Sequence, residues 1–362
     1  MTTPGGLRIL VDGYWWESGA PSGRNVIKSL VGSWLAEQPE DRLTLAIPRH
    51  ERAAVDEDLR RSSITTDLVT FPRTARLGAL AARSLGRRSA GYDAVLTQNF
   101  AARSRGAVSC VLVHDAMWVD HPEWFSVPER AYLSAVRPSL RDADIIFTTS
   151  QAETERIARV WPETRSRLRP VGLGVPVSLS EAAPQRPESL QDDLPFILVV
   201  GRLNIRKNLA RLLDAFVQSP TLPMTHRLVV VGERDGKVDR AATSSAAASV
   251  SFLDRIDDGQ LRWLYENCAL FIFPSLDEGF GLPLIEAQSL GARTLASDIP
   301  PFRELGGAEA YFDPRSIHDI ERAMSAAVDR PPIPQRSEPT GWDVVIRGIR
   351  EALGASMHAP IG

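Results

Sequence analysis

Short apolar runs alternate along the chain with segments in which apolar residues recur at helical spacing. The runs are rich in Val, Ile and Leu, which is typical of strands buried on both faces of a parallel sheet. The segments between them are typical of amphipathic helices. We expect strands at Leu7–Asp12, Arg42–Ile47, Asp67–Phe71, Asp93–Gln98, Val108–Asp115, Asp144–Thr149, Phe196–Val200, Arg227–Glu233, Ser249–Leu253, Leu270–Phe273 and Thr294–Asp298. This alternation predicts an α/β fold.

Two polar breaks interrupt the pattern and indicate two domains, which a chain of 362 residues also favours. Pro176–Asp193 is rich in Pro, Ser, Gln and acidic residues, so we interpret it as the interdomain linker. Pro331–Pro339 precedes a last predicted helix, whose apolar face is Trp342, Val345, Ile346, Ile349 and Leu353. The predicted boundaries are 1–178, 194–338 and, for the C-terminal helix, 339–362.

Composition excludes several classes of protein. No run of 18 apolar residues occurs, so no membrane-spanning helix is expected. The N-terminus lacks the basic region and apolar core of a secretory signal, and we expect a cytoplasmic protein. The net charge of −3 disfavours general nucleic-acid binding, which needs a strongly basic face. Cys110 and Cys268 are expected to be buried thiols in a reducing compartment rather than a disulfide or a metal pair.

The segment Arg60–Arg88 is the basic part of the chain, with seven arginines and one acid, Asp67. Its later arginines accompany Leu77, Leu80 and Leu85 at helical spacing, which predicts a basic amphipathic helix. Most helices of this kind are solvated faces of soluble domains. The alternative is peripheral contact with the inner face of a membrane, near a lipid-linked acceptor.

The stretch Phe271–Ala287, FIFPSLDEGFGLPLIEA, predicts a strand, a glycine loop and a helix that starts at a proline. Free N–H groups at such a helix start suit a phosphate or a sugar hydroxyl. Glu278 and Glu286 bracket the loop, which contains Gly279 and Gly281. The two carboxylates either face one ligand, or Glu286 merely complements the helix N-terminus while Glu278 is solvated.

The stretch GRLNIRKN, Gly201–Asn208, joins a buried strand to a helix that Lys207 and Asn208 are predicted to begin. Arg202 and Lys207 lie five residues apart across this turn. They can embrace a diphosphate, Arg through a planar fork and Lys as a point charge. Cations there would stabilise the charge that a leaving diphosphate develops. The alternative is a solvated pair at the surface.

In the first half of the chain, His114 and Asp115 end a predicted strand, and the carboxyl ends of strands hold ligands in α/β sheets. HPEWF follows shortly after, which favours a functional role for the pair, whereas His121 is expected to be structural. Gly13–Gly23 is a glycine-containing loop between a strand and a helix, either facing a ligand or forming a simple turn.

Together these motifs resemble the family 4 retaining glycosyltransferases, particularly mannosyltransferase-like members, over nearly the whole chain. The resemblance lies in Glu278, seven residues and Glu286 around GFGLP, in GRLNIRKN, and in HDAMWVDHPEWFS. SGAPSGR matches the family's glycine-rich loop at Gly23 and Arg24 but lacks its doubled glycine. The family implies the GT-B fold, with two Rossmann-like domains facing each other across a cleft and a C-terminal helix that crosses back to the first domain.

The resemblance also implies the reaction. A hexosyl group would pass, with retention, from a nucleotide-diphosphate sugar to a saccharide, lipid-linked or small-molecule acceptor, as in polysaccharide biosynthesis. HPEWF leans towards GDP-mannose, with a UDP-sugar as the alternative. Retention in the family is described as front-face attack, in which a donor phosphate oxygen takes the acceptor's proton. No Asp-x-Asp metal motif is evident, so we expect neither a metal nor a cofactor.

Residue roles follow by resemblance. Arg202 and Lys207 would neutralise the diphosphate, and Glu286 would hold the ribose hydroxyls. Glu278 would bind the sugar and steady its developing positive charge. His114 would hydrogen-bond the donor sugar, and Asp115 would orient that histidine or the acceptor. The remaining donor contacts implied are Gly23, Gly201, Gly279, Phe280, Gly281 and Leu282, with Arg255 and Ile256 near the base.

Other functions share this architecture. A phosphorylase would carry a lysine-bound pyridoxal, and a sugar epimerase would act on the donor without an acceptor. A non-catalytic nucleotide-sugar-binding subunit would bind the donor but neither transfer nor hydrolyse it. The stretch GERDGK lacks the spacing and the Ser or Thr of a P-loop, so an ATPase is excluded.

Overall fold

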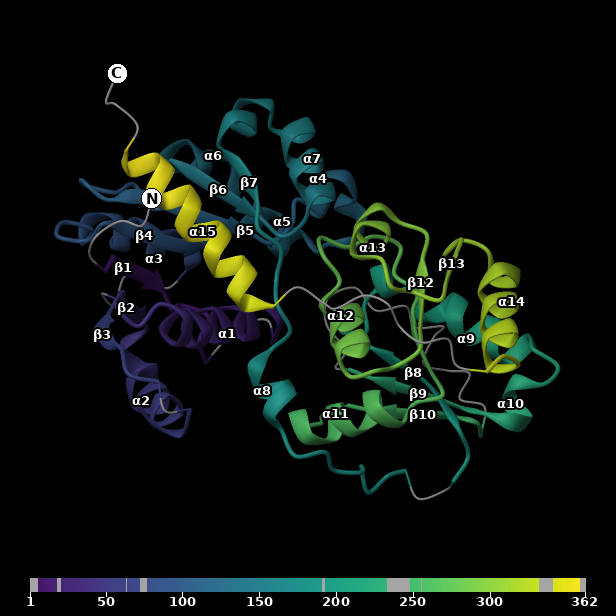
Figure 1. Cartoon of the computed structure of the whole chain (residues 1–362). Coiled ribbons are helices and arrows are strands. Elements are labelled where there is room, and N and C mark those ends of the chain that lie inside the picture. Colours follow the sequence, from purple (N-terminus) through teal and green to yellow (C-terminus); the bar gives the residue numbers. More distant parts are fainter. Residues whose placement is uncertain are drawn as a thin grey trace. The chain divides into compact units, whose positions relative to one another are not determined.

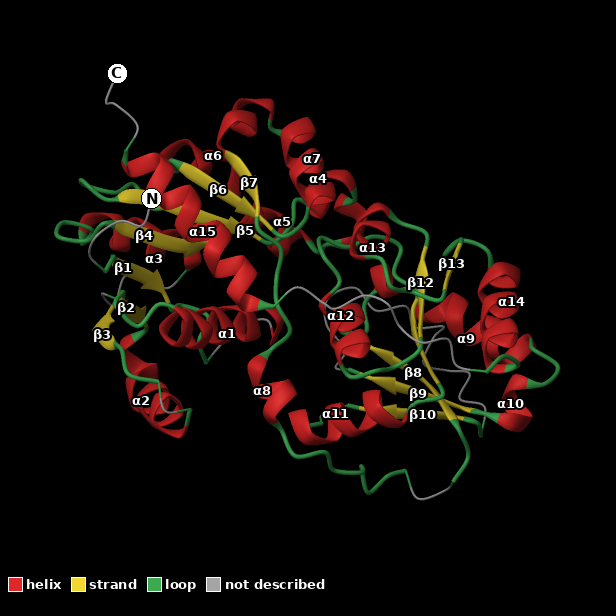
Figure 2. Ribbon diagram, in the orientation of Figure 1, coloured by secondary structure: helices red, strands yellow, loops and turns green. Residues whose placement is uncertain are grey.

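The computed structural model describes residues 6–17, 21–62, 64–71, 77–190, 193–232, 248–254, 256–331 and 341–358. The chain forms two compact units (Figures 1 and 2). The first takes in the described residues of Met1–Val119, Val127–Gly174 and Thr340–Gly362. The second takes in those of Asp120–Ser126 and Val175–Pro339.

The first unit is built on a seven-stranded sheet with the order β3-β2-β1-β4-β5-β6-β7, in which every pair of neighbours is parallel. Its strands are β1 (Arg8–Asp12), β2 (Arg42–Ile47), β3 (Asp67–Thr70), β4 (Ala94–Gln98), β5 (Val108–Val113), β6 (Ile145–Thr148) and β7 (Leu168–Pro170). The order reverses direction between β1 and β4, which makes that place the switch point where α/β sheets bind ligands.

Helices connect these strands, as parallel pairing requires. They are α1 (Pro21–Glu37), η1 (Arg49–Glu51), α2 (Arg52–Arg61), α3 (Gly78–Arg87), α4 (Met117–Asp120), η2 (Pro122–Trp124), α5 (Val127–Leu133), α6 (Val136–Ser139), η3 (Leu140–Asp142), α7 (Gln151–Val160) and η4 (Pro162–Arg167). The C-terminal helix α15 (Trp342–Met357) returns to this unit and lies beside α1, which confirms the predicted crossing back (Figure 1).

The second unit repeats the plan with six parallel strands in the order β10-β9-β8-β11-β12-β13. The strands are β8 (Phe196–Val200), β9 (Arg227–Val231), β10 (Val250–Leu253), β11 (Leu270–Phe273), β12 (Thr294–Ser297) and β13 (Ala310–Phe312). The helices are α8 (Val177–Glu181), η5 (Ile205–Lys207), α9 (Leu209–Gln218), α10 (Leu222–Thr225), α11 (Asp258–Asn267), α12 (Leu282–Ser289), α13 (Pro300–Leu305) and α14 (Ile317–Val328). Here the switch point lies between β8 and β11.

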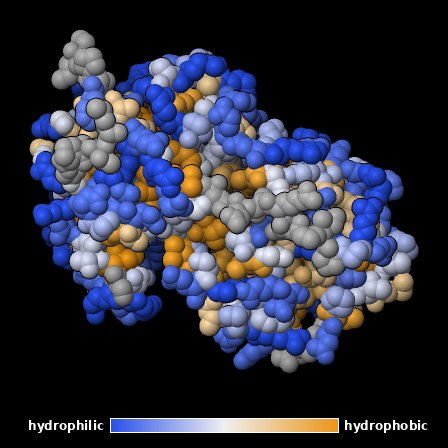
Figure 3. Space-filling model, in the orientation of Figure 1, coloured by the Kyte–Doolittle hydropathy of each residue, from blue (hydrophilic) through white to orange (hydrophobic). Residues whose placement is uncertain are grey.

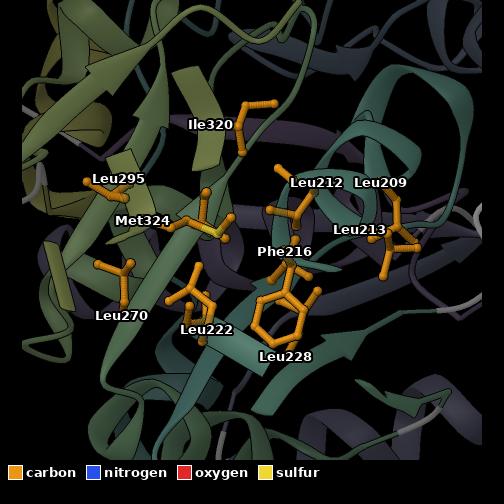
Figure 4. Packing of buried hydrophobic residues seen from close by; sticks show 14 of the residues in the cluster. Leu209, Leu212, Leu213, Phe216, Leu222, Leu228, Leu270, Leu295, Ile320 and Met324 are labelled. Atoms are coloured by element: carbon orange, nitrogen blue, oxygen red, sulfur yellow. The ribbon is translucent and has the colours of Figure 1, made fainter. Parts of the chain in front are cut away.

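Alternate residues of the central strands enter two separate cores, one on each face of this sheet. Ile197 of β8 and Ile272 of β11 belong to the core that packs against helices α9 and α14. Phe216 of α9 and Met324 of α14 lie in the same core (Figure 4). Leu198 of β8 and the phenylalanines of β11 pack on the other face. Burial on both faces explains why these strands are continuous apolar runs in the sequence.

Each strand predicted from the sequence is present, within about two residues at either end. The predicted fold class, two Rossmann-like parallel-sheet domains, is confirmed. The interpretation of Pro176–Asp193 as a linker is partly wrong, because part of it is ordered structure. Val177–Glu181 forms helix α8, and Leu179 and Leu190 are buried in the second unit's core. Two anchoring leucines are too few to produce an apolar period. The short strand β7 was not predicted.

Among the described residues, no helix combines the length and the apolar composition needed to cross a membrane. On the face drawn in Figure 3, hydrophilic side chains predominate and hydrophobic areas are smaller and interspersed. Cys110 and Cys268 are both free thiols, the first buried and the second half-buried. Burial raises the pKa of Cys268 to about 12.

Candidate functional site

Two loops leave the second sheet at its switch point. Strands β8 and β11 are parallel neighbours, with Leu198 opposite Phe271. Their carboxyl ends therefore meet at the same edge of the sheet. One loop begins at Gly201 after β8, and the other begins at Pro274 after β11. The predicted diphosphate motif and the predicted Glu278 motif are thus brought together by strand order.

Two glycines allow the first loop to pass close to the next strand. Gly201 and Gly232 have φ angles of +150° and +146°, which L-residues rarely adopt. A Cβ atom on Gly232 would lie 2.0 Å from the carbonyl oxygen of Gly201, closer than any real contact. The chain turn that delivers Arg202 and Lys207 therefore depends on Gly232, a residue outside the sequence motifs.

Asn208 joins the two loops and ends the turn that carries Lys207. It has left-handed backbone angles, φ 58° and ψ 29°. Its side-chain amide donates to the carbonyl oxygens of Pro274 at 3.0 Å and Pro314 at 2.7 Å. The prediction that Lys207 and Asn208 begin a helix holds for Asn208, which is the N-cap residue of α9 (Leu209–Gln218), but Lys207 ends the 3₁₀ turn η5. The left-handed asparagine prevents the two from merging.

Lys207 and Glu278 form a buried ion pair across these loops. Nζ of Lys207 lies 2.5 Å from Oε1 of Glu278, and the side chains are 12% and 9% exposed. Ser275 donates its hydroxyl to the same oxygen at 2.8 Å. Nη1 of Arg206 lies 3.7 Å from Oε2. Lys207 also lies over the ring of Phe273, with Nζ 4.5 Å from its centroid, so the ammonium has an aromatic face on one side.

The electrostatics of this pair extend to Arg202. Burial lowers the pKa of Lys207 to about 8, against the opposing effect of Glu278, and the charges of Arg206 and Arg202 lower it further. Burial raises the pKa of Glu278, but Lys207 and Arg206 outweigh that effect, so the net pKa falls below its ordinary value. At neutral pH Glu278 is therefore a carboxylate held among cations.

Glu286 completes the cluster from helix α12. The Tyr265 hydroxyl, fully buried on α11, donates to Oε2 of Glu286 at 3.0 Å. Burial raises the pKa of Glu286 to about 7, while the bond from Tyr265 and the charge of Lys207 oppose the rise. Lys207 is thus electrostatically coupled to Arg202, Glu278 and Glu286. The structure thus brings Lys207 and Glu278 into contact, and Arg202 and Glu286 are close enough to interact with Lys207 electrostatically.

The glycine loop runs directly into α12. Gly279, Phe280 and Gly281 are buried, and Leu282 begins the helix as predicted within one residue. Gly281 has a φ angle of +120°, and a Cβ atom there would lie 2.8 Å from the ring of Phe302. The tight turn therefore needs glycine at this position, whatever ligand the helix start receives.

His114 lies at the corresponding edge of the first sheet, immediately after β5. Its ring Nε2 is 2.8 Å from Oε1 of Gln98, the last residue of β4. An amide oxygen only accepts, so Nε2 carries the proton in this arrangement. Burial lowers the pKa of His114, against the charge of Asp115, which favours the neutral ring. Gly23 lies in helix α1 and not in the predicted loop, and a Cβ atom on it would be 4.0 Å from the same Oε1, so Gly23 and His114 both lie near the side chain of Gln98.

The backbone around His114 is held on several sides. Asn99 accepts from the His114 amide at 3.1 Å, and the Thr149 hydroxyl donates to the His114 carbonyl at 3.1 Å. Asp115 accepts from the amide of Met117 at 3.3 Å. The atom that hydrogen-bonds the histidine ring is thus on Gln98, whereas the carboxylate of Asp115 stabilises the next turn.

Asp12 ends β1 at the same switch point and was not predicted as a site residue. It is buried and accepts from the Tyr14 amide at 2.9 Å. Burial raises its pKa to about 7, although backbone amides of Tyr14 and Gln98 oppose the rise. Its position could have been found from sequence, because Asp12 and Gln98 each end a predicted strand at the place where the sheet order reverses.

Some predicted contacts are not placed in the site. Arg255 lies outside the described residues, as do Arg73 and Arg76 of the basic segment. Ile256 is half-buried and packs against the second unit's core. Within the described ranges, no three His, Cys, Asp or Glu side chains are grouped in a way that could hold a metal ion.

Comparison with known proteins shows a matching family model and a similar overall fold. Residues 182–340 match the family model described as "Glycosyl transferases group 1". This match falls almost entirely within the second unit, Val175–Pro339. In overall fold, HepE of Anabaena, solved in complex with UDP and glucose, superposes with a TM-score of 0.61 at 17% identity, covering 97% of this chain and 94% of that one. Both chains have the GT-B fold class.

Two curated relatives are mannosyltransferases of Escherichia coli. The serotype-specific mannosyltransferase WbdA is 33% identical over 200 residues, which are 51% of this chain and 24% of WbdA. The O-antigen chain mannosyltransferase B is 26% identical over 219 residues, 57% of this chain and 58% of the relative. The chain thus spans between about a quarter and three fifths of the length of these relatives.

Proposed function

We propose that this protein is a retaining glycosyltransferase of family 4 that moves a hexosyl group from a nucleotide-diphosphate sugar to a saccharide, lipid-linked or small-molecule acceptor. The observation that carries the proposal is the Lys207 cluster, in which two loops and helix α12 present cations beside two buried carboxylates. A nucleoside-diphosphate sugar offers the matching parts: a dianionic diphosphate, a ribose diol and a sugar carbon that becomes positive.

Each residue would have a separate role. Arg202 and Lys207 would bind the diphosphate and stabilise the charge that it gains as it leaves. Glu286 would accept hydrogen bonds from the ribose hydroxyls. Glu278, kept ionised by its cations, would lie beside the sugar and stabilise the positive charge on its reacting carbon. The N–H groups at the start of α12 would support the donor's oxygens.

Retention would follow front-face attack. The acceptor hydroxyl would approach the reacting carbon from the side of the leaving diphosphate and pass its proton to a donor phosphate oxygen. The bond between that carbon and the diphosphate breaks as the new glycosidic bond forms. No protein carboxylate needs to bond to the sugar, and the cations beside Glu278 favour a carboxylate that remains an electrostatic partner. We further propose that the reaction is independent of metal ions.

GDP-mannose is our first choice of donor and a UDP-sugar is the second. Both curated relatives are named as mannosyltransferases, and HepE was solved with UDP and glucose. These names support a hexosyl donor and leave two bases to be compared by experiment. The acceptor is proposed to meet the first unit, where Asp12, Gln98 and His114 gather at a switch point.

We further propose that the segment Arg60–Arg88 makes peripheral contact with a membrane surface. In the described part of this segment, Leu77 and Leu80 are 52% and 41% exposed, and Arg83 and Arg87 of the same region are exposed too. Exposed leucines beside arginines suit an anionic lipid surface. Co-sedimentation should show binding to anionic vesicles and little to neutral ones. Equal and negligible binding to both would remove this part of the proposal.

A thermal-shift screen of UDP-, GDP-, ADP- and dTDP-sugars, followed by transfer assays with the hit, tests the main proposal. A ligand that binds only the native state raises the melting temperature. We expect one sugar nucleotide to do so and to be consumed much faster with an acceptor than by slow hydrolysis alone, with activity unchanged by EDTA. Isomerisation of the donor alone would indicate an epimerase. Binding without transfer or slow hydrolysis, across a broad acceptor panel, would indicate a binding subunit.

Arg202→Ala and Lys207→Ala are the matched variants for this assay. Each should reduce turnover by about 100-fold or more, because a preorganised cation at the leaving group is removed. Arg322→Ala removes one positive charge from the exposed face of α14 and serves as the control. Turnover close to that of the wild type in both Arg202→Ala and Lys207→Ala would contradict the assigned roles.

A further inference from the structure

Arg206 is a third cation in the cluster, and the predicted pair of Arg202 and Lys207 does not include it. It precedes Lys207 in η5, and its side chain is 15% exposed. Its Nη1 lies 3.7 Å from Oε2 of Glu278, whereas Lys207 occupies Oε1. The Arg206 carbonyl accepts from the Leu276 amide at 2.8 Å, which fixes its loop against the loop of Glu278. Each carboxylate oxygen thus has its own cation.

The two cations differ in what else they are needed for. Under the proposed function, Lys207 has to bind the diphosphate as well as Glu278. The Lys207 ammonium has three N–H donors, which the carboxylate and the diphosphate would share. A bound diphosphate would therefore draw the ammonium away from Glu278. A buried carboxylate that loses its only cation becomes protonated or leaves its position. An arginine guanidinium is a permanent cation, and the proposed function gives Arg206 no diphosphate to bind, so it stays beside Glu278 when Lys207 turns to the ligand.

A count of charges leads to the same conclusion. Arg202, Arg206 and Lys207 are positive, Glu278 is negative, and the pKa of Glu286 is raised to about 7, so Glu286 is only partly charged at neutral pH. With Arg206 cancelling Glu278, the charges of Arg202 and Lys207 remain for the diphosphate. Without Arg206, the carboxylate would cancel one of those two cations, and the anion would meet a weaker field.

We propose that Arg206 is a positioning residue that holds Glu278 ionised and in place while Lys207 turns to the diphosphate of the donor. This inference rests on the proposed function. It assigns Glu278 two counter-ions with different tasks, a permanent one and one that is shared with the ligand. It does not require Arg206 to touch the donor.

Other groups near Glu278 have to be considered in its titration. The Ser275 hydroxyl donates to Oε1 of Glu278. The backbone amide of Glu278 donates to Oδ1 of Asp277 at 2.8 Å. His121 has its Nε2 3.7 Å from Oδ2 of Asp277. Arg202 and Glu286 act on the pair through Lys207. All of these are unchanged in a variant of Arg206, so a comparison of variants isolates its effect.

Calorimetric binding of UDP and GDP in buffers of different ionisation enthalpy, at pH 6.5 and pH 8, tests the inference. The variants are Arg206→Gln, which removes the charge, Arg206→Lys, which keeps it, and the surface control Arg322→Gln. For Arg206→Gln we expect nucleoside diphosphate affinity about tenfold weaker at pH 8, the equivalent of about 1.4 kcal/mol. At pH 6.5 we expect close to one extra proton taken up on binding, because Glu278 protonates as Lys207 leaves it.

Turnover gives an independent reading. In Arg206→Gln the acid limb of the kcat profile should move up by about one pH unit or more, because more Glu278 is protonated at a given pH. Arg206→Lys should resemble the wild type, and so should Arg322→Gln. If Arg206→Gln is folded and matches the wild type in proton uptake and in the acid limb, the inference is overturned while the proposed function stands. If the wild-type protein binds no nucleoside diphosphate, both are overturned.

Discussion

Nζ of Lys207 lies 2.5 Å from Oε1 of Glu278, although 71 residues separate the two along the chain. The pair spans the switch point of the second sheet, where the loops after β8 and β11 leave the same edge. Both side chains are almost completely buried. A buried pair of this kind contributes little net stability against apolar replacements, but removal of one partner leaves a costly isolated charge. We therefore infer that the pair serves ligand binding rather than the stability of the fold.

This pair predicts a specific pattern of stabilities in the absence of ligand. Lys207→Met should lower the free energy of unfolding by about 3 kcal/mol, because Glu278 then loses its nearer cation and keeps the more distant Arg206 and the hydroxyl of Ser275. The double variant Lys207→Met, Glu278→Gln should recover much of that loss. Denaturant unfolding at pH 7.5 measures both. A double variant whose loss equals the sum of the two single losses would show that the pair is not coupled.

Glu286 should make the free energy of unfolding depend on pH with the sign opposite to that of a typical paired carboxylate. Its pKa is raised from 4.5 to about 7 by burial, so the folded state holds more protons than the unfolded state between these values. Its contribution to stability therefore falls as pH rises through that window, by on the order of 3 kcal/mol, and is constant above it. Glu286→Gln should raise the melting temperature at pH 8 and change it little at pH 4.5.

The same substitution should weaken nucleotide binding. The amide oxygen introduced by Glu286→Gln would still accept the bond from Tyr265, but the side chain would lack the charge that holds the ribose hydroxyls. In the wild type, binding of the nucleoside diphosphate should strengthen as pH rises towards 7 and Glu286 ionises, and should weaken above pH 8 as Lys207 loses its proton. Thermal unfolding with and without GDP or UDP gives both readings. A variant that is destabilised equally at pH 4.5 and pH 8 would contradict the raised pKa.

Substitution of Gly232, which has no proposed role in binding or catalysis, should lower the stability of the fold. Gly232→Ala should cost several-fold more than Gly291→Ala, because both have positive φ but only the first would place a Cβ atom against the carbonyl of Gly201. A left-handed angle such as that of Gly291 costs about 1 kcal/mol, and the excess at Gly232 measures the steric contact together with its less accessible φ of +146°. Melting temperatures of the two variants give the comparison, and equal losses would mean that the loop at Gly201 adjusts freely.

Gln98 predicts a change at His114. Gln98→Leu removes the acceptor of the ring Nε2–H and should lower kcat/KM by about fivefold, the equivalent of one hydrogen bond of about 1 kcal/mol. Nitrogen NMR of labelled histidine should show the Nε2-protonated ring in the wild type and a mixture of tautomers in the variant. Gln98→Glu should raise the pKa of His114, because a carboxylate stabilises the charged ring. Identical histidine spectra in all three proteins would show that Gln98 does not hold the ring.

The sequence determined the architecture, because its apolar runs and helical periods respond to burial within each element. Strands such as β8 and β11 are apolar throughout since both of their faces are covered. It also marked Arg202, Lys207, Glu278 and Glu286, because each sits in a local motif at the end of a strand or the start of a helix. These residues could be named one motif at a time.

Only the tertiary structure decided which groups meet. Gln98 beside His114, Tyr265 beside Glu286 and Arg206 beside Glu278 join residues from elements whose adjacency depends on strand order. The left-handed turn at Asn208 and the close approach of Gly232 to Gly201 also depend on contacts with distant backbone. The local sequence pattern reflects which side chains each element buries. The pKa values, the choice of counter-ions and the steric limits depend instead on contacts between segments that only folding brings together.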